Sequence, residues 1–133
     1  MATSKTVLHT DRAPAAVGPY SQGVRASSLI FTAGMIPLDP ATGKLVEGDI
    51  EPQTRRTLEN LKALLEDSKS SLRNVVKTTV FLRNMDDFKR FNAIYAEFFA
   101  EECPARSTVE VSRIALDALV EVEAIAFVDE IDG

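Results

Sequence analysis

Near its C-terminal end the chain has a run of residues whose side chains alternate in character. In the run 120–128, small and medium apolar residues occupy the even positions. The odd positions begin with Glu121 and Glu123 and end with Ile125 and Phe127. A period of two is typical of a β-strand with two different faces. Carboxylates seldom share a face with core residues, so we expect the early half of this strand to face a cleft, a subunit boundary or solvent.

Similar patterns predict the other elements of the chain. The predicted strands are 5–9, 24–26, 29–36, 74–82, 108–114 and 120–128, and the predicted helices are 51–68 and 86–102. Each helix carries one broad apolar stripe at helical spacing. Pro52 stands in the first turn of one helix and Pro104 just beyond the other, two positions where proline is tolerated. The segment 37–48 is predicted as a turn-rich loop, and the order is β-β-β-α-β-α-β-β.

The predicted order contains only two helices, and this number bears on whether the chain forms an oligomer. Two amphipathic helices can cover only one face of so wide a sheet. The strands still place apolar side chains on the other face, and a monomer would expose them to water. We therefore expect a homo-oligomer that buries this face.

The length and the ends of the chain favour one soluble domain. At 133 residues the chain fits a single domain, 1–133, that can bury its own core. Its longest apolar runs are interrupted by charge and are too short to cross a bilayer. The first residues lack the apolar segment of a signal peptide. A cytoplasmic location and no membrane partner are the expectations.

Charge and composition narrow the chemistry. The formal net charge of −5 opposes a nucleic-acid partner, because such proteins depend on basic patches. The nearest candidate patch, Arg55 with Arg56, lies in an otherwise acidic helix. A single cysteine and a single histidine exclude an intrachain disulfide and most metal sites. The candidate chemistry is therefore left to arginine, tyrosine, glutamate and backbone groups.

Arg106 and Glu121 are the leading candidate site residues. Arg106 stands just before one predicted strand and Glu121 at the start of the next, so the two could meet at one rim of the sheet. A surface ion pair is the ordinary role of such an arginine, and its alternative is a bidentate clamp on a substrate carboxylate. Glu121 is either solvated or a general acid/base with a pKa raised by burial. The pattern does not separate Glu121 from Glu123.

Other polar residues have a structural and a functional interpretation. Tyr20 either packs its ring in a loop or contributes a hydrogen bond and one wall of a pocket. Asn92 either bonds a neighbouring backbone or contacts a ligand. Gly34, inside a predicted strand, indicates a bulge or a close approach by another group. Cys103 and His9 could form a nucleophile and base, but no third group orients them, so we expect Cys103 to pack at a helix end.

Six short motifs stand in the order found in one protein family. They are Gly18-Pro19-Tyr20-Ser21-Gln22-Gly23, Thr32-Ala33-Gly34-Met35-Ile36-Pro37, Val76-Lys77-Thr78-Thr79-Val80-Phe81, Asn92-Ala93-Ile94-Tyr95 with Phe98-Phe99, Pro104-Ala105-Arg106-Ser107, and Val120-Glu121-Val122-Glu123-Ala124-Ile125-Ala126. Each motif alone is weak, but together they resemble the RidA (YjgF) family of reactive enamine and imine deaminases. The resemblance extends over nearly the whole chain.

The resemblance implies a fold and a reaction. The fold would be α/β (α+β) and chorismate-mutase-like, with a mixed six-stranded sheet, two helices on one face, and a homotrimer with sites between subunits. The activity would be that of a 2-iminobutanoate/2-iminopropanoate deaminase, which hydrolyses 2-aminoacrylate or its imine tautomer to a 2-keto acid and ammonia. No metal or organic cofactor is implied.

The resemblance also implies roles for particular residues. Arg106 would bind the substrate carboxylate, Glu121 would help to activate the attacking water, and Tyr20 would complete the pocket. Gly34 and Asn92 would contribute to substrate binding. A further contributor is the backbone carbonyl of Thr108.

Four positions depart from the pattern of the family. Thr108 stands where many members have cysteine, Met35 where glutamine is common, Ala33 where serine is common, and Ala115 where proline is usual. These departures leave the arginine clamp intact and bear on the range of substrates.

Two other functions remain open at this stage. One is a non-catalytic trimer that binds 2-keto acids or similar metabolites and regulates partners. The other is an RNA-directed activity, such as that of an endoribonuclease or a translation inhibitor, which the acidic charge opposes.

Overall fold

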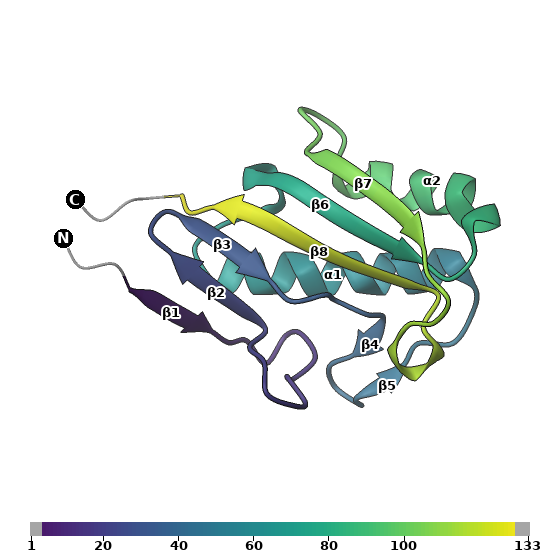
Figure 1. Cartoon of the computed structure of the whole chain (residues 1–133), viewed down its shortest axis with the longest axis horizontal. Coiled ribbons are helices and arrows are strands. Elements are labelled where there is room, and N and C mark those ends of the chain that lie inside the picture. The colour runs from purple at the N-terminus through teal and green to yellow at the C-terminus, as the bar shows by residue number, and fades with distance from the viewer. Residues whose placement is uncertain (1–3, 130–133) are drawn as a thin grey trace.

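The computed structural model describes residues 4–129, so 1–3 and 130–133 of the expected domain lie outside it. Its strands are β1 (Lys5–Leu8), β2 (Gly23–Ala26), β3 (Leu29–Thr32), β4 (Leu38–Asp39), β5 (Lys44–Leu45), β6 (Val75–Leu82), β7 (Ala105–Glu110) and β8 (Val120–Phe127). Its helices are α1 (Ile50–Asp67) and α2 (Phe88–Phe98), with 3₁₀ turns at Leu72–Asn74, Met85–Asp87 and Ala115–Asp117. Six strands form one sheet and both helices cover the same face of it, as predicted (Figure 1).

The strand order of the large sheet is β1-β2-β3-β8-β6-β7. Its neighbours are antiparallel from β1 through β6, whereas β6 and β7 are parallel. The parallel pair arises because α2 carries the chain back across the sheet between these two strands, and a parallel pair needs such a crossover. The sheet is therefore mixed, as expected, with β1 and β7 at its edges.

The alternation in the last strand has the predicted structural meaning. β8 lies inside the sheet between β3 and β6 (Figure 1). The side chains on its helix-covered face are buried, namely Val120, Val122, Ala124 and Ala126. On its opposite face Glu121, Glu123 and Ile125 are half-buried and Phe127 is exposed. One face of this strand therefore belongs to the core and the other does not.

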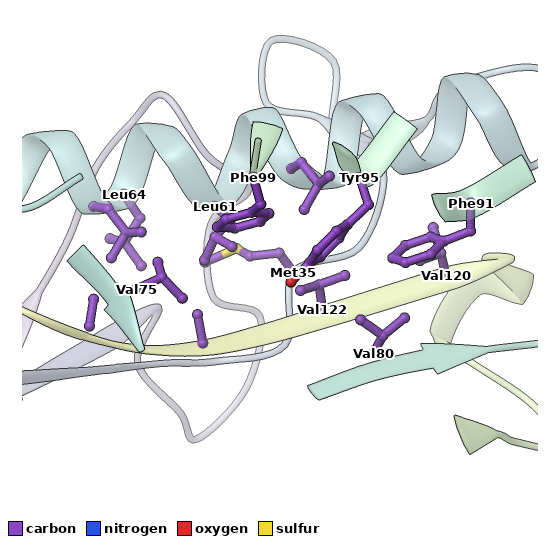
Figure 2. Packing of buried hydrophobic residues seen from close by; sticks show 14 of the residues in the cluster. Met35, Leu61, Leu64, Val75, Val80, Phe91, Tyr95, Phe99, Val120 and Val122 are labelled. Carbon is purple, nitrogen blue, oxygen red and sulfur yellow. The ribbon is translucent and has the colours of Figure 1, made fainter. Parts of the chain in front are cut away.

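The core lies between the helices and the covered face of the sheet. Figure 2 shows Leu61 and Leu64 of α1 and the rings of Phe91, Tyr95 and Phe99 pointing at the strands. The ring centroids of Phe91 and Tyr95 are 5.4 Å apart, and those of Tyr95 and Phe99 are 4.6 Å apart, a favourable spacing for aromatic pairs. No helix within residues 4–129 is both long and apolar enough to cross a membrane.

Two predicted segments differ in the region between β3 and α1. The predicted strand 29–36 ends at Thr32, because the chain bulges away from the sheet and returns only at Met35, which bridges to Val122. The predicted loop 37–48 contains the short hairpin β4–β5 (Figure 1). The hairpin is too short to show an alternating pattern in the sequence.

Two other boundaries shift around α2. A 3₁₀ turn precedes the helix, and the side chain of Asn84 accepts a hydrogen bond from Asp86 N at 2.9 Å there. The helix ends at Phe98 rather than at residue 102, because Phe99 leaves the helical conformation with a φ of −123° and a ψ of 75°. The following strand, β7, consequently includes Arg106 instead of beginning after it.

The face of the sheet away from the helices is uncovered in the single chain. Strand register places a group of apolar side chains on it, of which the exposed members are Val7, Leu29, Phe31, Val109 and Phe127. An apolar group of this kind commonly marks an association surface. The expected homo-oligomer remains a prediction.

Candidate functional site

A cavity of about 710 Å³ opens at one end of the sheet. Its walls come from three segments, namely 14–22 before β2, 33–43 through β4 of the β4–β5 hairpin, and 115–121, which ends in the first residues of β8 (Figure 1). Most lining side chains are apolar. The polar ones are those of Tyr20, Gln22 and Glu121. The cavity thus brings together three of the predicted site residues, Tyr20, Gly34 and Glu121.

Gln22 holds the loop that carries Tyr20. Its buried side chain accepts a hydrogen bond from Thr10 N at 2.8 Å and donates to Thr10 O at 3.0 Å and Pro14 O at 2.8 Å. The Tyr20 hydroxyl accepts a hydrogen bond from Val17 N at 3.3 Å, and its ring is about half exposed. Gln22 is therefore a positioning residue, and Tyr20 presents its ring at the cavity.

One wall of the cavity is formed by a bulge of the backbone at the end of β3. Thr32 Oγ1 accepts a hydrogen bond from Ala124 N at 3.0 Å, in place of a backbone carbonyl. Met35 then exchanges backbone hydrogen bonds of 2.8 and 3.0 Å with Val122. Gly34 lies between these two attachments. Its backbone is therefore next to β8 but does not take part in the regular strand pairing of β3.

Glu121 folds its side chain over Gly34. A Cβ atom at Gly34 would lie 2.7 Å from Glu121 Cδ and closer still to its carboxylate oxygen. Only glycine permits this approach. Glu121 lines the cavity and Glu123 does not, which distinguishes two carboxylates that the sequence pattern left equivalent.

The surroundings of Glu121 alter its proton affinity. Burial raises the pKa of the Glu121 carboxyl, and the negative charge of Glu123 raises this pKa further. Both effects disfavour the charged carboxylate. A carboxyl group with a raised pKa is better matched to exchanging protons near neutral pH than an ordinary one.

This raised pKa predicts a pH-dependent stability. The folded state holds the Glu121 proton to higher pH than the unfolded state, so stability falls as pH rises from the unfolded pKa through the folded one. Glu121→Gln removes this penalty. We expect the variant to melt at a higher temperature than wild type at pH 8, with the difference vanishing below about pH 4.

Thermal unfolding across this pH range, followed by circular dichroism, measures the effect. Glu101→Gln, on the exposed segment after α2, is the control and should show no such difference. An equal effect at pH 4 and pH 8 would contradict the role of ionisation.

Arg106 lies away from the cavity, against α2. Its guanidinium carbon is 4.7 Å from the ring centroid of Tyr95, 5.5 Å from that of Phe88 and 5.6 Å from that of Phe91. Such stacking is favourable for a guanidinium group and limits its orientation. Among residues 4–129 no carboxylate forms an ion pair with Arg106. The arginine is therefore held by aromatic rings while its charge stays available.

The expected meeting of Arg106 and Glu121 within one chain is wrong. Their strands are not neighbours, because β6 lies between β7 and β8. Arg106 pairs with Thr78, which pairs with the buried Ala124, so Arg106 faces the helices. Glu121 is an odd number of residues from Ala124 and faces the other way.

Two further predicted residues lie on the side of Arg106. Thr108 is two residues along β7 and therefore shares its face. Asn92 occupies α2 one turn from both Phe88 and Tyr95, and its Oδ1 is buried without a hydrogen-bond partner among the described residues. The predicted site residues thus form two groups, one at the cavity and the other beside α2.

Tyr95 connects this second group to the core. Its hydroxyl and Thr78 Oγ1 are 2.8 Å apart and hydrogen-bonded. Burial raises the pKa of the Tyr95 phenol, although the Thr78 hydrogen bond and the charge of Arg106 oppose the shift. Tyr95 therefore stays neutral and supports Arg106 through its ring.

The remaining candidate residues, Cys103 and His9, have separate hydrogen-bond partners and do not form a nucleophile–base pair. Cys103 Sγ donates to Phe99 O at 3.2 Å just beyond the end of α2, but Cys103 is exposed rather than packed as expected. His9 Nε2 contacts Asp11 Oδ1 at 3.0 Å. Within residues 4–129 no group of His, Cys, Asp and Glu is suited to holding a metal ion.

Sequence reasoning missed several residues of these sites. The aromatic rings of α2 do more than fill the core, because those of Phe88, Phe91 and Tyr95 also hold Arg106. An aromatic stripe directly before a strand arginine is a signal that could have indicated this. Val17 and Leu116 line the cavity as exposed apolar residues, and no local pattern marks them.

The chain is similar to known proteins over nearly all of its length. The sequence profile of the family described as Endoribonuclease L-PSP matches residues 10–128. A RutC family protein of Pyrococcus horikoshii is 53% identical over 123 residues, which cover 92% of this chain and 98% of that protein. The 2-iminobutanoate/2-iminopropanoate deaminase of Salmonella typhimurium is 48% identical over 126 residues, covering 92% and 97%.

Solved structures agree with these sequence relationships. The YjgF gene product of E. coli superposes with a TM-score of 0.88 at 44% identity, covering 92% of this chain and 98% of that one. E. coli TdcF with bound serine gives a TM-score of 0.88 at 42% identity, with the same coverage. These similarities extend over both groups of site residues.

Proposed function

Because the chain belongs to the Endoribonuclease L-PSP family, which includes the RidA/YjgF proteins, we propose that it hydrolyses reactive 2-imino and 2-enamino acids to 2-keto acids and ammonia. The observation that carries the proposal is the Glu121 carboxyl group, which lies in an apolar cavity with a raised pKa. The deaminase name of a 48% identical relative supports the same reaction.

The proposed reaction needs one water, one proton carrier and one anchor. The Glu121 carboxylate accepts a proton from the water, whose oxygen attacks the imine carbon while the C=N electron pair moves to nitrogen. Glu121 returns the proton to that nitrogen. The resulting carbinolamine loses ammonia as its hydroxyl becomes the keto group, so imine and water give 2-keto acid and ammonia.

Arg106 is the proposed anchor for the substrate carboxylate. Its guanidinium group can donate two parallel hydrogen bonds to a carboxylate. The aromatic rings of α2 limit the orientations available to it. Tyr20 closes the other side of the bound substrate. Holding the substrate in a fixed orientation contributes much of the rate enhancement in a site with so few catalytic groups.

The positions of Arg106 and Glu121 on opposite faces of the sheet support a site shared between two copies of the chain. A substrate that contacts both groups must lie between β7 of one subunit and the cavity of another. The uncovered apolar face of the sheet supplies a surface for association. We propose a homotrimer with its sites at the subunit boundaries.

Mixing two inactive variants tests this arrangement. Arg106→Ala retains Glu121, and Glu121→Gln retains Arg106, so a mixed trimer contains some boundaries with both native groups. We expect a co-refolded equimolar mixture to recover about a quarter of wild-type activity, because each boundary draws its two contributors independently.

The control for the mixing experiment is each variant refolded alone, which should stay inactive. Sedimentation of wild type at micromolar concentration should give the mass of three chains. A monomer with full activity, or a mixture without recovery, would contradict a shared site.

The reaction itself is measured by trapping. An amino-acid oxidase generates an imine in situ, and semicarbazide competes for it. We expect the protein to suppress semicarbazone formation and Arg106→Ala to fail to do so. If wild type fails with small and aromatic imines alike, a metabolite-binding trimer becomes the better interpretation. Retention of the protein on single-stranded RNA at physiological salt would instead favour an RNA-directed activity, against which the charge of −5 weighs.

A further inference from the structure

The cavity beside Glu121 is larger and more apolar than the proposed reaction requires. Its volume of about 710 Å³ lies in the range of sites that hold drug-sized ligands. A three-carbon imino acid would fill a small part of the volume that the single chain encloses, and β7 of a second subunit would border the open side in the proposed trimer. The Gln22 amide already bonds backbone groups of the loop, so Glu121 and Tyr20 are the lining side chains left for polar contacts. The rest of the wall offers apolar surface.

Two of the apolar lining residues are strongly exposed in the single chain. Val17 is 81% exposed and Leu116 is 66% exposed. Val17 belongs to the loop before β2 and Leu116 to the turn before β8, so two separate parts of the chain present aliphatic side chains to one cavity. Exposed aliphatic groups that converge on a cavity mark a binding surface better than scattered ones.

Leu116 is also held in an unfavourable backbone conformation. Its φ of 58° lies in the left-handed region, and so does the φ of 59° at Asp117. Glycine and asparagine adopt this region readily, whereas leucine does so at a cost. Strain at a non-glycine residue is characteristic of functional sites.

The surrounding structure fixes this turn. Ile114 and Ala118 on either side of it are buried. Asp117 N donates to Ile114 O at 3.1 Å, and Leu119 N donates to the side chain of Gln53 in α1 at 2.8 Å. The turn is therefore attached to the core at both ends, and the exposed Leu116 side chain is presented from a defined position.

We infer that the cavity selects imino acids with large apolar side chains, of the leucine or phenylalanine kind, and that Leu116 and Val17 are specificity-determining residues. The inference rests on the proposed function for its reaction and goes beyond it in the class of substrate. Glu121 would act on the imine group while the apolar wall contacts the substrate side chain.

Binding of stable keto acids tests the inference without catalysis. Titration calorimetry compares 4-methyl-2-oxopentanoate, which carries the leucine side chain, with pyruvate. We expect wild type to bind the former at least about tenfold more tightly, a typical discrimination by an apolar pocket. Equal affinity, or tighter binding of pyruvate, would overturn the inference.

Variants at Leu116 assign the preference to this residue. Leu116→Asn keeps the side-chain size and suits the left-handed backbone, and it should reduce the preference about tenfold. Leu116→Met should retain it. Met85→Asn, at an exposed apolar residue outside the cavity, is the matched control and should leave the preference unchanged. An equal loss for both keto acids in Leu116→Asn would contradict a role in selection.

A turnover measurement separates this inference from the proposed function. A D-amino-acid oxidase supplies the imines of D-leucine and D-alanine, and semicarbazide traps what the protein leaves. Discrimination between keto acids without hydrolysis of either imine would support the selective cavity and refute the deaminase. Hydrolysis of both imines at equal kcat/KM would establish the deaminase and refute the selection.

Discussion

Replacing Glu121 with glutamine is expected to lower kcat for imine hydrolysis by about a hundredfold to ten-thousandfold, the usual contribution of a general acid/base. Glutamine has nearly the same shape but accepts no proton from water. Substrate binding should change little, because the proposed anchor of the substrate carboxylate is Arg106, which this variant retains. The measurement is the rate of ammonia release at saturating imine, together with calorimetric titration of a keto acid.

Glu123→Gln provides a sharp comparison. Glu123 is two residues away on the same strand face, but it does not line the cavity. Its removal should preserve most activity and move the acidic limb of the pH–rate profile to lower pH, since the charge of Glu123 contributes to the raised pKa of Glu121. A larger loss of kcat in Glu123→Gln than in Glu121→Gln would transfer the catalytic role to Glu123.

Arg106→Ala is expected to reduce kcat/KM by about a thousandfold, because truncating one member of a charged hydrogen-bonded pair costs about 2–5 kcal/mol. The loss should concern binding as well as rate. Arg106→Lys keeps the positive charge without the planar fork, so it should recover only part of the activity. Keto-acid affinity and imine turnover, measured on the same preparations, give both quantities.

The control for Arg106 is Arg73→Ala, because Arg73 is exposed and lies outside the cavity. It should retain wild-type kinetics. The stability of Arg106→Ala needs its own melting curve, since the guanidinium group stacks on three rings of α2. Full activity in Arg106→Ala would refute the carboxylate anchor and leave the fold assignment intact.

The sequence predicted elements well where their pattern was local and long. The alternation of β8 and the apolar stripe of α1 are repeated over many residues, so their burial followed. Short or interrupted elements were predicted poorly. The hairpin β4–β5 has two residues in each strand, and the early end of β3 depends on the bulge at Gly34.

The candidate site was predicted residue by residue but not in its arrangement. Tyr20, Gly34 and Glu121 were singled out, and they share one cavity. Arg106 was also singled out, but its stacking on the α2 aromatics and its position on the other face were not foreseen. The role of Leu116 depends on a turn conformation that no pattern in the sequence indicates.

The order of residues along the chain is enough to predict which residues alternate, which stretches form helices, and which side chains are able to perform carboxylate and proton chemistry. Which of these side chains face one another depends on how the strands pair in the folded molecule. β6 pairs with both β7 and β8, so these two pairings determine which side chains of β7 and β8 lie on the same face of the sheet. A shift of one residue in either pairing would turn every side chain of the shifted strand to the opposite face. The register of these pairings is set by contacts between residues far apart in the chain, and it places Arg106 and Glu121 on opposite faces of one sheet.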